Sequence, residues 1–270
     1  MMPVTTPVHR PTMPHLNARL NNAEERASLA ARYLQATPFQ HVVIDDVFPE
    51  AMLDAVVDDF SRVRHNTVYN DKTTLRKHTC DEWGRFPPAT FDMISYLNCG
   101  EFVSFLSEVT GIQGLTSDPY LMGGGLHETM PGGFLKMHVD FNYHRRLELD
   151  RRINAIIFLN RQWEPSWGGE LVLADPGMNT QVPVAPIFNR MVLFNTNDFS
   201  YHGQPDPHTF PEGNSRKSIA MYYYSNGRPA HETTSAKVGT TYKARHSGDL
   251  PMLERLKEAA RLLAGTKRAR

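Results

Sequence analysis

A histidine and an aspartate two positions apart are the clearest chemical signal in this sequence. His138 and Asp140 end the stretch Gly-Gly-Phe-Leu-Lys-Met-His-Val-Asp. Because alternate side chains of an extended strand share a face, both would point to one side, about 6–7 Å apart along the backbone. An imidazole and a carboxylate placed in this way can bind one first-row metal ion. A second histidine would complete a two-histidine, one-carboxylate site with open coordination positions.

The second histidine has to come from elsewhere in the chain. His138 is the only histidine followed by Asp two positions later, and the candidates downstream are His144, His202, His208, His231 and His246. We favour His202, because it ends a strand-like segment that a barrel could place beside 134–140. Gly203 would then allow a tight turn. His144 lies among arginines and is expected at a solvated rim, whereas His208 lies in a proline-rich loop.

Arg216 is a candidate anchor for an anion. The segment 216–224 is predicted to be a strand, and alternation places Arg216, Ser218 and Tyr222 on one face. A guanidinium inside a barrel is costly unless it meets an anion, and its geometry suits a carboxylate. Ser218 could donate a further hydrogen bond to the same group. The alternative, an edge-strand arginine in solvent, stays open at this point.

Composition excludes several classes of protein. The 270 residues carry 29 Lys and Arg against 29 Asp and Glu, so bulk charge favours neither a nucleic-acid nor a membrane partner. The two cysteines, Cys80 and Cys99, do not form a disulfide framework and fit a reducing cytoplasm, which is the expected location. We expect neither a signal peptide nor a membrane-spanning helix. The sequence gives no prediction of oligomeric state.

The first half of the chain is predicted to be largely helical. Apolar spacing and proline positions indicate helices over 16–35, 49–63 and 91–109 (the last broken at Gly100), and a strand over 39–47. The polar segment 64–90 is expected to be irregular, either bordering a pocket or forming a plain surface loop. A closing helix is predicted over 249–264.

From residue 121 onward, short strands alternate with turn residues. The predicted strands are 121–129, 134–140, 153–159, 170–174, 182–186, 191–195 and 217–224. This pattern is typical of an all-β sandwich or barrel, here with flanking helices. We therefore expect one structural domain with four parts: a flexible arm (1–14), a helical support and loop region (15–118), a β core (119–230) and a C-terminal extension (231–270).

The order of these motifs resembles a known family. HVD, WGGEL, NRMVLF, the His202-Gly203 pair and SRKSIAMYYY follow one another as in the Fe(II)/2-oxoglutarate-dependent dioxygenases, in particular the prolyl 4-hydroxylase-like branch. The resemblance covers roughly residues 120–230 and implies a double-stranded β-helix (jelly roll) core. It also implies that His138, Asp140 and His202 bind a catalytic iron. Arg216, helped by Ser218, would hold the distal carboxylate of 2-oxoglutarate.

This sequence departs from the family at one cofactor position. A tyrosine that binds 2-oxoglutarate in the collagen and hypoxia-type enzymes is matched by Phe158, and Asn154 on the same strand could supply a polar contact instead. His127, Lys136 and Tyr222 are further candidates for the substrate pocket. Lys136 is included because alternation places it on the face of His138.

The resemblance implies a reaction and a set of cofactors. These are Fe(II), 2-oxoglutarate as co-substrate, O₂, and ascorbate as a reductant. The expected outcome is hydroxylation of an unactivated C–H bond of a small molecule or a peptidyl, prolyl-type substrate, with release of succinate and CO₂. Halogenation is not expected because Asp140 is present. Two alternatives remain: a zinc-dependent hydrolase that uses the same three ligands, and a non-catalytic jelly-roll binding module.

Overall fold

A computed structural model describes Met13, residues 15–232, residues 239–243 and Leu256. Apart from Leu256 and Met13, the predicted closing helix (249–264) and the predicted N-terminal arm (1–14) lie outside these residues. No helix in the described part of the chain is both long and apolar enough to cross a membrane.

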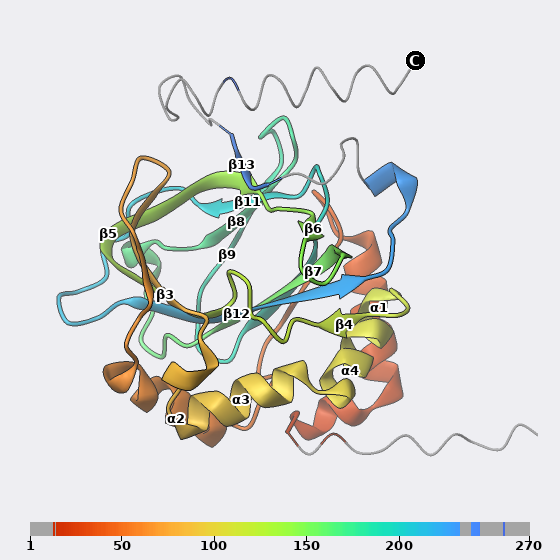
Figure 1. Ribbon diagram of the computed structural model, residues 1–270, viewed down its shortest axis with the longest axis horizontal. Coiled ribbons are helices and arrows are strands. Elements are labelled where there is room, and N and C mark those ends of the chain that lie inside the picture. The colour runs from red at the N-terminus through yellow and green to blue at the C-terminus, as the bar shows by residue number, and fades with distance from the viewer. Residues whose placement is uncertain (1–12, 14, 233–238, 244–255, 257–270) are drawn as a thin grey trace, which may run out of the picture.

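Four α-helices lie together on one side of the β structure (Figure 1). They are α1 (Ala23–Gln35), α2 (Glu50–Asp59), α3 (Pro88–Asn98) and α4 (Gly100–Thr110). Short 3₁₀ turns lie at η1 (Ala18–Asn21), η2 (Phe60–Arg62), η3 (Trp83–Arg85), η4 (Pro165–Trp167) and η5 (Ala230–Glu232). The predicted helix 16–35 is interrupted at Asn22, whose side chain caps α1 by accepting hydrogen bonds from two backbone N–H groups. The predicted helices over 49–63 and 91–109 are present.

The strands form one sheet that folds back on itself. They are β1 (His41–Ile44), β2 (Thr67–Tyr69), β3 (Thr74–Cys80), β4 (Thr116–Ser117), β5 (Gly125–Val139), β6 (Tyr143–His144), β7 (Leu149–Phe158), β8 (Leu171–Ala174), β9 (Gln181–Val184), β10 (Met191–Asn195), β11 (Tyr201–Gln204), β12 (Arg216–Ser225) and β13 (Thr241–Tyr242). The main order is β1-β10-β7-β12-β5-β11-β8-β9, and all the strand pairs are antiparallel.

Strand β5 joins the two halves of this sheet. Its first part pairs with β12, its second part pairs with β11 and β13, and β3 pairs with both parts. The prediction of two separate strands, 121–129 and 134–140, was therefore wrong. Gly132, with φ of 80°, and Gly133 lie between them, and this irregular stretch bends the strand without ending it.

The segment 64–90 is not an irregular loop. It contains the β2–β3 hairpin, and β3 pairs with β5, so this segment widens the sheet at its edge. Its polar composition hid the hairpin, because the alternating apolar residues that identify a strand are largely absent.

Side chains on the two faces of the sheet have different partners. The outer face of β7, β10 and β12 packs on the helices through apolar residues such as Ile153, Leu193 and Ile219. The inner face contributes to a second apolar cluster, which consists of Phe39, Phe158, Leu171, Leu173, Val184, Val192 and Phe194. This inner cluster closes one end of the space between the two halves of the sheet, and the polar site occupies the rest.

Candidate functional site

Strands β5 and β11 bring the two predicted metal-binding histidines together. His202 pairs directly with His138 across the two strands, and their ring centroids are 4.4 Å apart. Asp140 follows the last residue of β5. The Nε2 atoms of His138 and His202 lie 3.5 and 3.3 Å from the two oxygens of its carboxylate. Separations of this size suit three ligands around one ion.

Backbone carbonyls orient both imidazole rings. Nδ1 of His138 lies 2.9 Å from the Lys136 carbonyl oxygen, and Nδ1 of His202 lies 3.0 Å from the Ser200 carbonyl oxygen. A hydrogen bond at Nδ1 places the proton there and leaves Nε2 with a free lone pair. Both rings therefore present a metal-binding nitrogen toward Asp140. Burial lowers the pKa of His138, which also favours the neutral ring.

The carboxylate of Asp140 is held by two buried side chains from β7. Arg151 and Asn154 each donate a hydrogen bond of 2.8 Å to its Oδ2. Asn154 accepts bonds in turn from Arg151 and from the Thr196 hydroxyl. Burial alone would raise the pKa of Asp140, but Arg151 and the histidines hold it well below its ordinary value. Asp140 is therefore ionised, with Oδ1 left to face the metal position.

Asn154, which we predicted to contact the cofactor, lines the pocket and donates to Asp140, and a contact with the cofactor stays a prediction. Arg151 was not anticipated at all. Strict alternation would place Arg151 on the helix side with Ile153, but the β7–β12 pairing shifts by one residue between these two positions. This β-bulge turns Arg151 inward, where its guanidinium lies 3.5 Å from the ring centroid of Tyr222 and 4.3 Å from that of Phe141.

Arg216 lies at the other end of the same pocket. Its Nε donates a 2.6 Å hydrogen bond to the Gly169 carbonyl, and its guanidinium lies 5.0 Å from the Phe158 ring centroid. Within the described part of the chain, no carboxylate forms an ion pair with it. Burial lowers its pKa to about 10, so it remains charged at neutral pH. Glu170 opposes this effect of burial from beyond ion-pair distance. A buried, charged guanidinium without a direct ion pair among the described residues fits the capture of an anion.

The pocket between these groups has a volume of about 260 Å³. Ser218, predicted to contact 2-oxoglutarate, lines this pocket, as do His127 and Tyr222, which were predicted to contact the substrate. His127 Nε2 lies 3.1 Å from the Gly123 carbonyl oxygen, and the Tyr222 hydroxyl donates to that same oxygen. These two residues close one side of the pocket.

Lys136 does not line the pocket, so its placement beside His138 was wrong. His138 pairs with His202 of β11, and Leu135 pairs with Gln204. These two pairs are three residues apart on β5 but only two residues apart on β11, so β5 carries one additional residue between them. The additional residue puts Leu135 rather than Lys136 on the face of His138. The Lys136 ammonium instead lies 4.8 Å from the Phe134 ring centroid.

Two other expectations, one about His144 and one about Gly203, need correction. His144 is not at a solvated rim, because it is 1% exposed and its Nε2 lies 3.4 Å from an Asp118 oxygen. Gly203 does not form a turn. It lies within β11, where an added Cβ would meet the Leu135 carbonyl oxygen at 2.8 Å. His208 is buried against Phe210, away from the triad.

Lys77 on β3 is a pocket residue that the sequence did not suggest. It pairs with Thr129 of β5, and Arg216 pairs with the same threonine from the opposite side. The ammonium forms no salt bridge with any residue in the described segments. Burial, together with Arg216 and Arg151, lowers its pKa to about 8 despite the opposing effect of Asp140. Only recognition of the hairpin could have placed it here.

Comparison with known proteins identifies the class of this core. Residues 124–224 match the model of the 2OG-Fe(II) oxygenase superfamily, and this segment contains the triad and Arg216. No curated protein sequence gives a significant match. The predicted resemblance to the Fe(II)/2-oxoglutarate-dependent oxygenases is therefore confirmed for the β core.

Solved structures of these oxygenases share the fold. A prolyl hydroxylase from Trichoplax adhaerens, in complex with a hypoxia inducible factor peptide, is 20% identical, with a TM-score of 0.56 over 75% of this chain and 91% of that chain. An oxidoreductase of the 2OG-Fe(II) oxygenase family from Burkholderia pseudomallei is 16% identical, with a TM-score of 0.53 over 77% and 96%. HygX from Streptomyces hygroscopicus, with nickel, 2-oxoglutarate and hygromycin B bound, is 12% identical, with a TM-score of 0.52 over 76% and 88%. The jelly-roll prediction is thus confirmed.

Proposed function

We propose that this protein is a Fe(II)- and 2-oxoglutarate-dependent dioxygenase that hydroxylates an unactivated C–H bond of a small-molecule or peptidyl, prolyl-type substrate. One observation carries the proposal. The pocket that contains His138, Asp140 and His202 also contains Arg216, a buried cation without a carboxylate partner in the described residues. A zinc hydrolase would have no use for this guanidinium, and a binding module would have no use for the triad.

One end of the pocket would bind the iron, and the other end would bind the distal carboxylate of 2-oxoglutarate. His138 and His202, each through Nε2, and Asp140 through Oδ1 would hold the iron. Arg216, with the Ser218 hydroxyl, would bind the distal carboxylate of 2-oxoglutarate. When bound, iron supplies the oxidising chemistry that couples decarboxylation of 2-oxoglutarate to hydroxylation, with release of succinate and CO₂.

The protein environment keeps this chemistry in a fixed geometry. Arg151 and Asn154 occupy Oδ2 of Asp140, so the carboxylate cannot rotate away from the metal position. Phe158 and Leu171 present apolar surface beside Arg216 and the pocket, which helps to exclude water from the carboxylate contact. Ascorbate as a reductant and a cytoplasmic location remain parts of the proposal.

The charge of the pocket favours an anionic substrate. Asp140 forms its ion pair with Arg151, and 2-oxoglutarate would bind Arg216, so the ammonium of Lys77 has no ion pair of its own among the described residues. A substrate with a carboxylate or a similar anionic group would provide it.

The test is anaerobic binding of Fe(II) and 2-oxoglutarate to wild-type protein and to Arg216→Ala. We expect a weak visible charge-transfer band in the wild type that fades in the variant at the same 2-oxoglutarate concentration. Absence of the band, together with tight zinc binding, would favour the hydrolase. Absence of metal binding at the triad would leave a jelly-roll binding protein.

A further inference from the structure

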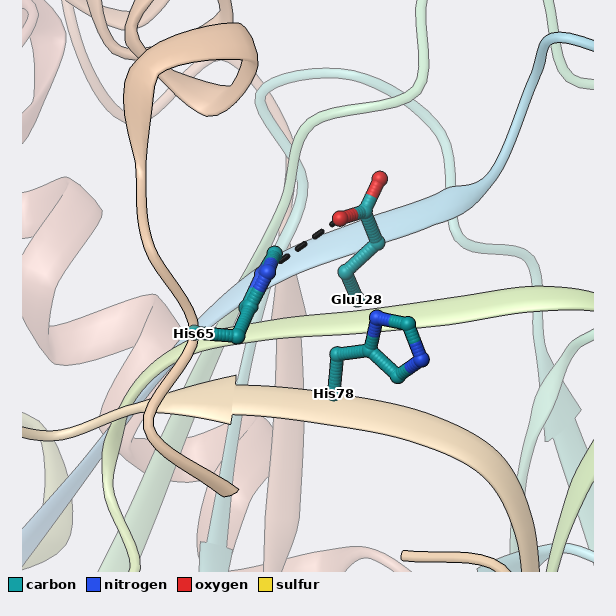
Figure 2. Close-up of side chains that lie close together, drawn as sticks. All are labelled: His65, His78 and Glu128. Atoms are coloured by element: carbon teal, nitrogen blue, oxygen red, sulfur yellow. Dashed lines mark ion pairs between the residues drawn. The ribbon is translucent and has the colours of Figure 1, made fainter. Parts of the chain in front are cut away.

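A second cluster of metal-binding side chains lies on β3, on β5 and on the segment just before β2. His65, His78 and Glu128 each offer one ligand atom, and these atoms lie within 4.8 Å of one another. Figure 2 shows the three side chains close together, with the ion pair between His65 and Glu128 as a dashed line. Nε2 of His65 is 3.4 Å from Oε2 of Glu128, and the two imidazole centroids are 5.4 Å apart.

This cluster lies on the opposite face of β5 from the pocket. His127 and Thr129, which flank Glu128 in the sequence, both line the pocket, and alternation directs Glu128 to the other side. The same holds on β3, where Lys77 lines the pocket and His78 follows it. All three cluster residues are partly exposed, whereas the catalytic triad is buried. The cluster therefore lies nearer the protein surface than the triad does.

The backbone fixes the positions of these ligands. His78 and Glu128 are a direct cross-strand pair of β3 and β5. His65 is held through its neighbour Asn66, whose amide N–H donates to the Thr79 carbonyl oxygen. The Asn66 side chain also forms two hydrogen bonds with Asp81. The ligands are thus held before a metal binds, which lowers the cost of ordering them.

Neighbouring polar groups orient the glutamate. Oε1 of Glu128 accepts a short hydrogen bond from the Ser215 hydroxyl and lies 3.5 Å from the Lys217 ammonium. Oε2 is left toward His65. Lys217 is the positive charge nearest the cluster, but it contacts the oxygen that would not bind the metal.

His65 is better suited to a metal than to its present partner. Its Nε2 is buried and has no hydrogen-bond partner of good geometry among the described residues. Burial and His78 lower the pKa of His65 against the opposing effect of Glu128, which favours the neutral ring. A neutral imidazole coordinates metal ions.

We propose that His65, His78 and Glu128 bind a divalent transition-metal ion, with Zn²⁺ the best match, at a site separate from the catalytic triad. Two imidazole nitrogens and one carboxylate oxygen are ordinary zinc ligands, and water would complete a tetrahedron. The ion would connect the β2–β3 hairpin and the segment before it to β5. It would thereby stabilise the edge of the pocket from which Lys77 projects.

The first test counts zinc ions in tag-free, full-length protein after chelator treatment, by equilibrium dialysis and elemental analysis. In a His138→Ala/His202→Ala background, we expect about one equivalent of zinc to remain. Adding His78→Gln or Glu128→Gln should weaken that binding at least about tenfold, because each removes a ligand. Adding His231→Ala, an exposed histidine elsewhere, should leave it unchanged. Loss of all zinc in the background, or full binding after Glu128→Gln, would overturn the proposal.

A second measurement needs no variant and separates the two sites. Diethyl pyrocarbonate modifies free imidazoles, and tryptic cleavage after Arg64 and Lys77 places His65 and His78 on separate peptides. Zinc should protect both peptides from modification in the wild-type protein. Protection of His138 and His202 alone would contradict the second site. Protection of His65 and His78 alone would support it and count instead against the proposed catalytic centre.

Discussion

Arg151 is the residue on which the geometry of the candidate iron site depends. Its side chain is 1% exposed, and it contacts Asp140, Asn154 and two aromatic rings. An arginine in the interior is acceptable only because Asp140 neutralises it and the rings cover it. Each partner therefore makes the burial of the other possible.

Removing one member of this buried pair should be costly. We expect Arg151→Met to lower the free energy of unfolding of the metal-free protein by about 3–5 kcal/mol, because Asp140 would lose the guanidinium that neutralises it. Urea denaturation measures this. The matched control is Arg146→Met, an exposed arginine over Tyr120, which should cost no more than about 1 kcal/mol. Equal effects of the two changes would show that the pair does not stabilise the fold.

Lys77 and Arg216 should have separable roles although they flank the same threonine. If Lys77 binds the substrate, Lys77→Met should leave the dissociation constant of 2-oxoglutarate within about twofold, whereas Arg216→Met should raise it at least about tenfold, the effect of roughly 1.4 kcal/mol. Titration of the anaerobic charge-transfer band measures both constants. A large effect of Lys77→Met would assign Lys77 to the co-substrate instead.

At the scale of elements, the close contact between β11 and β5 explains Gly203. A Cβ at this position would lie 2.8 Å from the Leu135 carbonyl oxygen and 3.0 Å from that of Lys136. Neither backbone oxygen can move without disturbing the strand pair that positions His138 and His202.

We therefore expect Gly203→Ala to lower the free energy of unfolding by about 1–3 kcal/mol and to weaken Fe(II) binding. Thermal or urea denaturation and metal titration measure the two effects. Gly84→Ala is the control, because a Cβ there meets nothing within 4 Å. Unchanged stability in Gly203→Ala would mean that the two strands can separate at little cost.

Elements whose apolar residues recur at a regular helical or strand spacing could be predicted from the sequence. The helices, most core strands and the grouping of His138, Asp140 and His202 were predicted from spacing and from the resemblance. The errors lie where a strand carries an additional residue. One irregularity near Arg152 turned Arg151 inward, and another between Leu135 and His138 turned Lys136 away. Alternation cannot reveal a bulge, because only the partner strand shows that a residue is unpaired.

The β2–β3 hairpin was missed for a different reason. Its residues are mostly polar, because one face lines a polar pocket and the other carries the His78 and Glu128 cluster. A strand that is polar on both faces lacks the pattern from which strands are recognised. Lys77, His65 and His78 were overlooked as a consequence.

At the scale of the whole molecule, buried neutral histidines make stability depend on pH. Burial and Arg216 lower the pKa of His208 to about 4, and burial lowers that of His127 well below its ordinary value. The unfolded chain therefore binds protons before the folded protein does. Stability should fall as the pH decreases from about 6.5 toward 4.

We expect the free energy of unfolding of metal-free protein to be lower at pH 5 than at pH 7.5, with a smaller decrease in His208→Gln. Urea denaturation at the two pH values measures both. His231→Gln, at an exposed position, should keep the wild-type dependence. An identical decrease in His208→Gln and wild type would mean that other groups control the pH dependence.

Strand β5 also limits how the protein can admit its substrate. Because its first part is hydrogen-bonded to β12 and its second part to β11 and β13, the two halves of the sheet share it. The two halves cannot move apart by a hinge motion without breaking the hydrogen bonds of one of these strand pairs. Molecules should therefore come and go at the mouth of the pocket, where Tyr69, Thr240 and Tyr242 lie. Residues at this opening would contribute to the choice of substrate, while the interior of the pocket keeps its shape.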